Sequence, residues 1–362
     1  MTPFVPTRIY IDEAVVGSSV TTRVLGKLQS IPQEIISSAD MLKNPMNMTD
    51  AKKVLFLTES KGASIKACQG GGGDYVCCDY FTISLTSNCH FECTYCILQD
   101  YLKNNPVISI FTNIDEILAG IQTRLEAKPD SIFRIGTGEL ADSLGLDPIT
   151  EYSKDLVAFT ARNKNMILEL KTKSTFIENL KELDHQGRVV VSWSVNPQSF
   201  IDKEEFKTAP LMARIQAART VADWGYKVGF HLDPLLNFDN WKDEYAHLVS
   251  LLKENFEDSE IAWISIGSLR YTKGLGRVIK ERWPKSDLLD GELFPTEDGK
   301  VRYFREIREQ MYGAVKKDLD LAFPGVANYL CMETSKLWDK VFKFVPKNTY
   351  EVERGILEKF HC

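Results

Sequence analysis

The sequence has no long apolar run and no recognisable leader. Its longest apolar stretches, such as 189–191 and 261–264, are too short to cross a bilayer. The amino-terminal residues lack a basic region followed by an apolar one, which a secretory leader would need. We therefore expect a cytoplasmic protein with no membrane partner.

An excess of basic residues is also absent, because the net charge is −6. A dedicated nucleic-acid binder is usually basic, so any contact with DNA must come from a local patch. The hydrophobic share of 44% and the charged share of 26% are ordinary for a globular protein. The 362 residues are enough for one barrel domain with additions, or for two to three small domains.

Cysteine is not scarce. Eight cysteines in a chain without a leader indicate free thiols or a metal site in a reducing compartment, not a disulfide scaffold. Cys89, Cys93 and Cys96 have the spacing C-x3-C-x2-C, on a loop between strand-like 80–85 and helix-like 113–126. Thiolates select iron–sulfur clusters or zinc. Three ligands would leave one iron of a 4Fe–4S cluster open to a small molecule.

Two other interpretations of the loop stay open from the residues alone. His90 would complete a Cys3His zinc site, although the chain has no second C-x2-C to pair with the loop. The three cysteines would otherwise be unrelated buried thiols.

Strands and helices alternate from residue 80 onward. Strands are predicted at 80–85, 131–135, 166–171, 188–195, 227–232 and 260–267, and helices at 113–126, 148–163, 176–183, 210–225 and 240–256. Such alternation predicts an α/β protein with parallel strands joined by right-handed crossovers. Polar residues follow nearly every strand, which favours a partial (β/α)6 TIM-type barrel over a doubly wound sheet.

Three domains are predicted, at 1–75, 76–272 and 273–362. The first is a small α/β unit with strands at 8–11 and 53–58, and Gly70–Gly73 reads as a flexible boundary after it. The last contains a hairpin at 294–303 with an Asp-Gly turn, a helix at 304–319 and a helical segment at 335–360.

The cysteine loop, with the aromatic Tyr95 before its third cysteine, resembles the signature of radical S-adenosylmethionine (SAM) enzymes. Much of the chain further resembles the spore photoproduct lyase family. The segments that carry this resemblance are 8–12, 93–99, 113–118, 172–173, 192–196, 229–234, 270–273 and the hairpin. The resemblance implies a 4Fe–4S cluster whose open iron chelates SAM, and a flavodoxin- or ferredoxin-type electron donor. Family members use the 5′-deoxyadenosyl radical to open a methylene-bridged thymine dimer in DNA and then regenerate SAM.

The resemblance also implies which residues bind SAM. The segment from Gly136 to Glu139 is similar to the Gly-Gly-Glu motif, in which the carboxylate accepts from the SAM ammonium. Lys173 would bind the SAM carboxylate, and Ser194 and Asn196 would reach its ribose and carboxylate. The alternatives are a helix N-terminal acid for Glu139, a solvated lysine, and capping of the next helix by Ser194 and Asn196.

Two departures from the family concern the return of hydrogen to the product radical. The family has a cysteine after the second barrel strand, but 136–142 has none, and Ile97 stands where the family has a tyrosine. Catalytic roles are assigned to Tyr95 and to Cys331, the latter as a relocated hydrogen donor or otherwise a packed thiol. The substrate is thus a DNA photolesion or, alternatively, a nucleoside, peptide or metabolite.

DNA contacts are predicted on the hairpin and beside the barrel mouth. The residues are Arg270, Lys273, Lys300, Arg302 and Tyr303. The arginine and lysine side chains would bind DNA phosphates, and Tyr303 would stack at a distorted base step. A solvated turn is the alternative.

Overall fold

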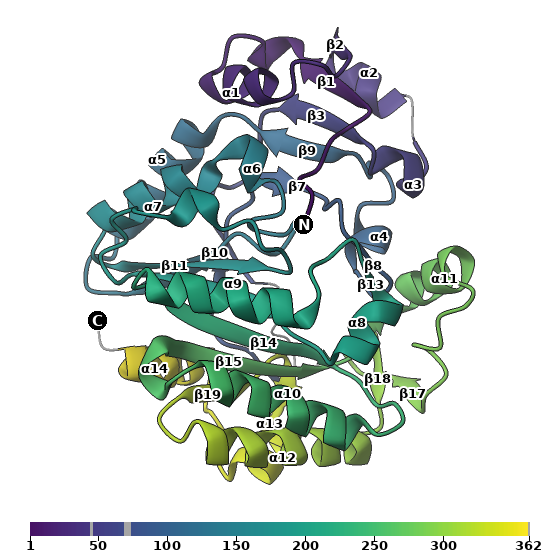
Figure 1. The fold of residues 1–362 in the computed structure, drawn as a ribbon, viewed down its shortest axis with the longest axis vertical. Coiled ribbons are helices and arrows are strands. Elements are labelled where there is room, and N and C mark those ends of the chain that lie inside the picture. The colour runs from purple at the N-terminus through teal and green to yellow at the C-terminus, as the bar shows by residue number, and fades with distance from the viewer. Residues whose placement is uncertain (44–45, 69–73, 361–362) are drawn as a thin grey trace. The chain divides into compact units, whose positions relative to one another are not determined.

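The computed structural model describes residues 1–43, 46–68 and 74–360 (Figure 1). These residues form two compact units. Unit 1 comprises 1–67, 81–92 and 98–189, and unit 2 comprises 68–80, 93–97 and 190–362. The domain boundaries predicted after residues 75 and 272 stay a prediction, and the predicted linker Gly70–Gly73 lies outside the described residues.

Unit 1 begins with a five-stranded sheet in the order β2-β1-β3-β9-β7. Its strands are β1 (Arg8–Asp12), β2 (Gln33–Ile36), β3 (Val54–Thr58), β7 (Thr86–Ser87) and β9 (Ile108–Phe111), all parallel except β7. The helices α1 (Ser19–Lys27), α2 (Ser38–Lys43) and α3 (Met48–Ala51) lie between the strands in sequence. Every residue of β3 is buried, as expected for a central parallel strand. The strands predicted at 8–11 and 53–58 are confirmed.

Unit 1 contains a second run of strands in the order β11-β10-β6-β4. They are β4 (Lys66–Ala67), β6 (Phe81–Thr82), β10 (Phe133–Gly136) and β11 (Met166–Thr172), with β4 antiparallel at the edge. The helix α5 (Ile114–Glu126) buries the apolar face predicted for it, at Ile114, Ile117, Ile121 and Leu125.

Two predicted helices of unit 1 differ from the structure. The segment 148–163 is divided into α6 (Asp147–Thr150) and α7 (Tyr152–Arg162), because Glu151 adopts a left-handed conformation with φ 54°. The helix predicted at 176–183 is wrong: only a 3-10 turn forms at 178–180, since Glu182 has a φ of 63° that no α-helix allows.

Unit 2 contains four parallel strands in the order β19-β15-β14-β12. They are β12 (Val189–Ser194), β14 (Lys227–Leu235), β15 (Ile261–Ser268) and β19 (Ala327–Leu330). Between them lie α8 (Gln198–Glu204), α9 (Leu211–Asp223) and α10 (Trp241–Asn255) (Figure 1). All of β15 is buried, which explains its apolar sequence. The short β19 was not predicted, because its four residues carry no clear period.

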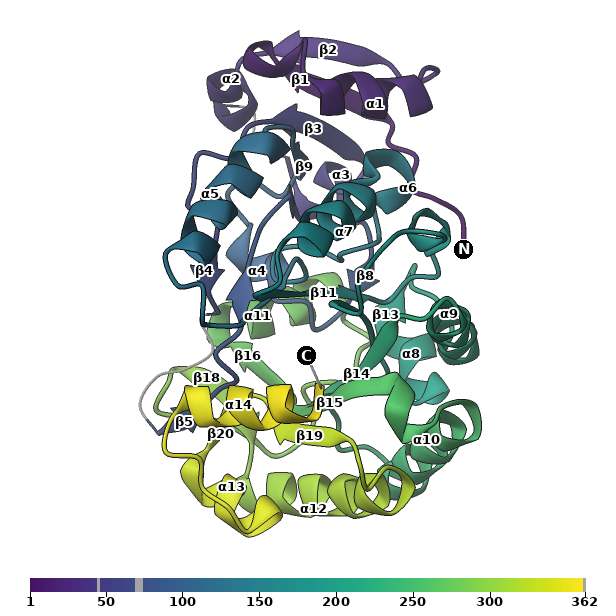
Figure 2. The same cartoon turned by 90° about the vertical axis from the view of Figure 1, so that its left-hand side faces the viewer.

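Three helices end unit 2. They are α12 (Arg305–Ala322), α13 (Ser335–Phe342) and α14 (Thr349–Phe360); α12 packs on α10 and α13, and α14 packs on β19 (Figure 2). The helix predicted at 304–319 is confirmed, whereas the one predicted at 335–360 is divided at Lys343, which has a φ of 56°. Within the described ranges, no helix is long and apolar enough to span a membrane.

A small antiparallel sheet of unit 2 joins β16 (Arg270–Thr272), β18 (Lys300–Tyr303) and β17 (Leu293–Pro295). The pair β17–β18 confirms the predicted hairpin, and Gly299 supplies the positive φ of 79° at its turn. The helix α11 (Lys273–Arg282) follows β16 and starts at Thr272, whose hydroxyl accepts from the Leu275 amide. A second pair joins β5 (Tyr75–Val76) to β20 (Glu333–Thr334). The predicted α/β class is confirmed, with mixed sheets.

Candidate functional site

Cys89 begins the cysteine loop in unit 1. The amide of Cys89 donates to the side chain of Asn88 at 2.8 Å, and its sulfur accepts from the Phe91 amide at 3.5 Å. Asn88 is fully buried in a left-handed conformation, and its own amide donates to the Leu140 carbonyl at 2.8 Å. The backbone thus ties the start of the cysteine loop to the loop that carries Glu139.

Cys93 and Cys96 lie in unit 2 on a tight turn, in which the Cys96 amide donates to the Cys93 carbonyl at 3.2 Å. The turn is fastened to Glu204 and Glu205. The Thr94 amide donates to the Glu204 carbonyl at 2.9 Å, and the Thr94 hydroxyl donates to the Glu204 carboxylate. None of the three loop cysteines is part of a disulfide among the described residues. Among the described residues, no three His, Cys, Asp or Glu side chains are arranged to hold a single metal ion.

Tyr95 anchors the loop to a buried ion pair. Its hydroxyl donates to Glu205, whose carboxylate pairs with Arg214 at 2.6 Å, and neither side chain of the pair is exposed. Burial, with the Glu205 charge beside it, holds the pKa of Tyr95 well above its usual range. A phenol that stays protonated and bonded serves here to position the loop. Sequence reasoning missed Glu204, Glu205 and Arg214, because 202–205 reads as a charged surface run.

The same ion pair reaches the predicted SAM residues of unit 2. The Ser194 carbonyl accepts from Arg214 at 2.8 Å. The Asn196 side chain donates to Glu205 at 3.2 Å and accepts from the Tyr245 hydroxyl at 3.0 Å. The alternative that these two residues cap the next helix is wrong, since Pro197 occupies the N-cap of α8 and no side-chain cap bond forms. Unit 2 therefore joins the end of β12 to the Cys93–Cys96 turn through one buried network.

In unit 1, Glu139 and Lys173 follow the adjacent strands β10 and β11. Glu139 accepts from the Thr82 hydroxyl at 2.7 Å, its one hydrogen bond among the described residues. Lys173 donates through its backbone to Asp142 at 2.7 Å, and the Thr172 hydroxyl donates to the same carboxylate at 2.6 Å. Burial raises the pKa of Asp142, against these hydrogen bonds. Asp142, which sequence reasoning missed, thus links the Glu139 loop to the end of β11.

The Glu139 loop has features that suit a ligand. The buried Thr137 hydroxyl has no hydrogen-bond partner among the described residues. A Cβ on Gly138 would lie 3.2 Å from the side chain of Lys171, a tight contact that Lys171 would have to relieve by a small shift. Glu139 precedes α6 by several residues, so the alternative of a helix N-terminal acid is wrong. The loop therefore offers a carboxylate and an unpaired hydroxyl, which fits an ammonium-bearing ligand such as SAM.

Asp233 in β14 and Arg270, the first residue of β16, form a bidentate ion pair with distances of 2.9 and 2.8 Å. Burial opposes the charge, but Asp233 outweighs it and holds the pKa of Arg270 above its ordinary value. His231, two residues before Asp233 in β14, is buried. Arg270 also donates to the Cys331 sulfur at 3.4 Å. The predicted DNA contact of Arg270 is thus a guanidinium already bound within the protein.

Cys331 is not a solitary thiol. It follows β19, and the β5–β20 ladder places it near Cys77 and Cys78, since Glu333 pairs with Val76. The Cys77 thiol makes hydrogen-bonding contacts with the thiols of Cys331, Cys68 and Cys78. Four of the eight cysteines therefore meet in unit 2, outside the predicted cluster loop.

The DNA contacts predicted for Arg302 and Tyr303 on the hairpin are wrong, because both side chains are buried. Arg302 is fully buried, paired with Asp298 at 2.5 and 2.8 Å, and its guanidinium lies 4.3 Å from the ring centre of Tyr75. Tyr303 is 2% exposed and accepts from the Asn237 amide. Tyr75 and Asn237, both distant in sequence, are among the partners of these two side chains. Lys300 is partly exposed, and Lys273 is exposed.

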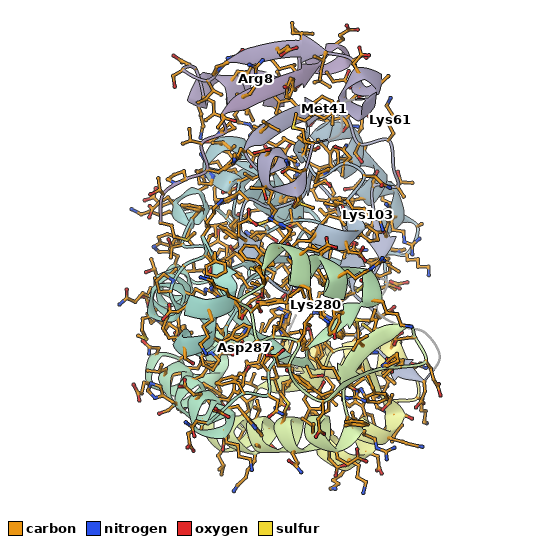
Figure 3. The ribbon with its side chains drawn as sticks, turned by 90° about the vertical axis from the view of Figure 1, so that its right-hand side faces the viewer. Arg8, Met41, Lys61, Lys103, Lys280 and Asp287 are labelled. Atoms are coloured by element: carbon orange, nitrogen blue, oxygen red, sulfur yellow. The ribbon has the colours of Figure 1, made fainter. Side chains whose placement is uncertain are left out.

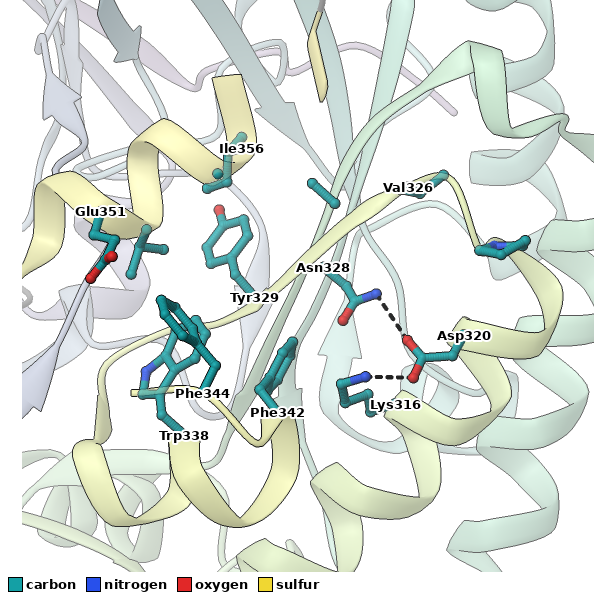
Figure 4. A pocket seen from close by; sticks show the side chains of 14 residues that line it. Lys316, Asp320, Val326, Asn328, Tyr329, Trp338, Phe342, Phe344, Glu351 and Ile356 are labelled. Atoms are coloured by element: carbon teal, nitrogen blue, oxygen red, sulfur yellow. Dashed lines mark hydrogen bonds and ion pairs between the residues drawn. The ribbon is translucent and has the colours of Figure 1, made fainter. Parts of the chain in front are cut away.

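The cavities lined by described residues of unit 2 include two of different size. One, of about 560 Å³, is lined by Thr94, Glu204, Phe206, Arg282 and Trp283 among others, and so borders the cysteine turn. The other, of about 300 Å³, lies among α12, α13, α14 and β19 (Figure 4). Trp338 and Phe342 line it, Lys316 and Asp320 form an ion pair at its side, and none of the predicted site residues reaches it.

Comparison with known proteins gives a consistent result. The family model for spore photoproduct lyase matches residues 4–319. The chain is 31% identical over 210 residues to spore photoproduct lyase of Geobacillus sp. (strain Y412MC61), which it covers over 62% of that protein's length. It is 25% identical over 338 residues to spore photoproduct lyase of Bacillus subtilis (strain 168), with 89% of this chain and 97% of that protein covered.

Solved structures agree with this match. A spore photoproduct lyase complexed with dinucleoside spore photoproduct has a TM-score of 0.82 and 24% identity, covering 91% of this chain and all of that one. A substituted form with bound AdoMet and dinucleoside spore photoproduct has a TM-score of 0.81 at the same coverage. The fold, a curled mixed α/β sheet, is the one these structures have.

Proposed function

The chain belongs to the spore photoproduct lyase family of radical SAM lyases, and we propose on that premise that it holds a 4Fe–4S cluster on Cys89, Cys93 and Cys96. When bound, the cluster supplies the electron that splits SAM and yields a 5′-deoxyadenosyl radical. The C-x3-C-x2-C spacing of these cysteines, none of which forms a disulfide, supports this proposal. We also propose that the six predicted strands form a partial (β/α)6 barrel, and that the protein works in the cytoplasm with a flavodoxin- or ferredoxin-type donor.

We assign SAM binding to four residues. Glu139 accepts from the ammonium of SAM, supported by the unpaired Thr137 hydroxyl in the same loop. Lys173 pairs with the carboxylate, and Ser194 lies toward the ribose. Asn196 is a positioning residue, because its side-chain nitrogen already donates to Glu205 and its side-chain oxygen already accepts from Tyr245. Tyr95 likewise fixes the cysteine turn by its bond to Glu205.

The proposed substrate is DNA that carries a pyrimidine photolesion of the thymine-dimer type. The support is family membership and the dinucleoside spore photoproduct bound by similar structures. A non-DNA substrate is the second candidate, favoured by the lack of a cysteine in 136–142 and by Ile97. Cys331 as the hydrogen donor stays a prediction; its contacts with Cys77 and Arg270 make it one thiol of a group.

The cysteine loop within a family match over 4–319 is the observation that carries the proposal. The test is an anaerobic assay of reduced, cluster-loaded protein with SAM and ultraviolet-irradiated DNA, in which each photoproduct is quantified. We expect loss of one thymine photoproduct with wild type and none with Cys93→Ala, which should lack about four irons per chain. Cys78→Ala is the control for iron content alone, because Cys78 is a buried cysteine of unit 2 outside the loop.

The outcomes separate the two candidate functions. SAM cleavage with no photoproduct lost would move the protein to a non-DNA substrate. Stoichiometric zinc without iron, or iron retained by Cys93→Ala, would overturn the proposed cluster site.

A further inference from the structure

The helix α11 carries three exposed cations on one face, which we name the cation stripe: Lys273, Arg277 and Lys280. Their spacing of four and three residues aligns them along the helix. Leu275 and Ile279 lie on the opposite face and are buried. The stripe is therefore a surface that the packing of α11 turns toward solvent, and Lys280 is labelled on it in Figure 3.

No described acid forms an ion pair with the stripe, although the exposed Glu281 lies four residues after Arg277 at its end. Among the described residues, none of its three cations has an ion-pair partner, although the chain as a whole has a net charge of −6. The first turn of α11 contains Lys273 and no acidic residue. Lys273 opposes the helix dipole at the N-terminus, whereas Lys280 lies in the last turn, where the dipole favours a cation. Three exposed cations without an ion pair among the described residues indicate an anionic partner.

Aromatic rings lie where α11 ends. Trp283, the residue after the helix, stacks on Phe206 with ring centres 5.3 Å apart, and the Arg282 guanidinium lies 5.2 Å from the Trp283 ring centre. Phe206 is 39% exposed. Both rings line the 560 Å³ cavity that Thr94 of the cysteine turn also borders. Cations followed by stacked rings suit a nucleic acid, whose phosphates and bases need both, better than an acidic protein.

We propose that the cation stripe binds the phosphate backbone of the DNA substrate. This inference rests on the proposed DNA function and deepens it by naming the surface. The three cations span seven residues, or about 10 Å along the helix axis, which is enough to contact about three phosphates. The stripe thus takes the role that the sequence assigned to Arg302 and Tyr303, which are buried.

The test measures binding of fluorescent irradiated duplex at several salt concentrations. The variant is Lys273→Ala with Arg277→Ala and Lys280→Ala. The matched control is Lys317→Ala with Lys336→Ala and Lys340→Ala, three exposed lysines of α12 and α13 in the same unit, which change net charge equally. Thermal unfolding checks that each variant folds. Lys273→Arg with Lys280→Arg keeps the charge and should keep the affinity.

The expected result is a slope of log K against log salt that is shallower by about 2.7 in the stripe variant, since each phosphate contributes about 0.9. The control should keep the wild-type slope. Equal slopes for the two triple variants would overturn the stripe while leaving DNA as substrate. A stripe variant that binds DNA normally but is no longer reduced by flavodoxin would instead assign the surface to an acidic protein. Wild type that binds no DNA at all would overturn both this inference and the DNA function.

Discussion

In unit 2, the residues around Cys93 and Cys96 form hydrogen bonds with one another; in unit 1, Thr137 and Glu139 form few. Tyr95, Asn196 and the Ser194 carbonyl all end on the buried Glu205–Arg214 pair. By contrast, Glu139 has a single hydrogen bond and Thr137 none among the described residues. The difference separates positioning from binding. One region is built to hold the loop in place, and the other keeps polar groups for a ligand.

The largest effect is expected for Arg214→Met in unit 2, which tests the positioning side of this contrast. Removing one partner of a buried ion pair leaves Glu205 uncompensated, so we expect the free energy of unfolding to fall by about 3–5 kcal/mol. Urea unfolding measures it. Arg8→Met is the control, because the Arg8–Glu34 pair is exposed and contributes about 0–1 kcal/mol. Similar losses in the two variants would remove the structural role assigned to the network.

Glu139→Ala tests the binding side. A charge-assisted hydrogen bond to an ammonium contributes about 1.5–3 kcal/mol, so SAM affinity should fall roughly tenfold to a hundredfold, with cluster content unchanged. Calorimetric titration of cluster-loaded protein measures it. Glu139→Gln keeps an acceptor for Thr82 and removes only the charge. Wild-type affinity in both variants would leave Glu139 without the proposed role.

Thr137→Val sharpens the same point. The unpaired hydroxyl costs stability in the free protein, so replacing it by a methyl group should leave the free energy of unfolding unchanged or raise it by about 1 kcal/mol. SAM affinity should fall severalfold, because the ligand loses one hydrogen-bond partner. A variant that is both less stable and equally able to bind SAM would show that the hydroxyl serves the fold.

The smallest expected effect concerns pH. Burial works against the charge of Asp298, but Arg302 holds the pKa of that carboxyl below its usual range. An acid with a lowered folded-state pKa stabilises the fold above its unfolded pKa of about 3.9, and this stabilisation is lost as pH falls toward the folded value. The stability difference between wild type and Asp298→Asn should therefore be constant near pH 7 and shrink below about pH 4. A difference that persists in acid would contradict the ion pair.

Much of the fold follows from local sequence, because β-branched and apolar runs such as 261–268 show their burial directly. The errors have nonlocal causes. A left-handed Glu151 divides one helix, and β19 becomes a strand only by pairing with β15. The cysteine spacing and the Glu139 motif could be recognised in the sequence, because each lies within a short segment. The buried states of Arg214 and Arg302 could not be recognised, since Arg214 also donates to the Ser194 carbonyl of β12 and Arg302 contacts Tyr75, far away in sequence.

The most direct test of the central claim is electron paramagnetic resonance of the reduced, anaerobically reconstituted protein before and after addition of SAM. We expect about four irons per chain and a reduced-cluster signal that shifts when SAM binds at the open iron. The shift should disappear in Cys93→Ala and require more SAM in Glu139→Ala. A cluster signal that SAM leaves unchanged at saturating concentration would contradict the account.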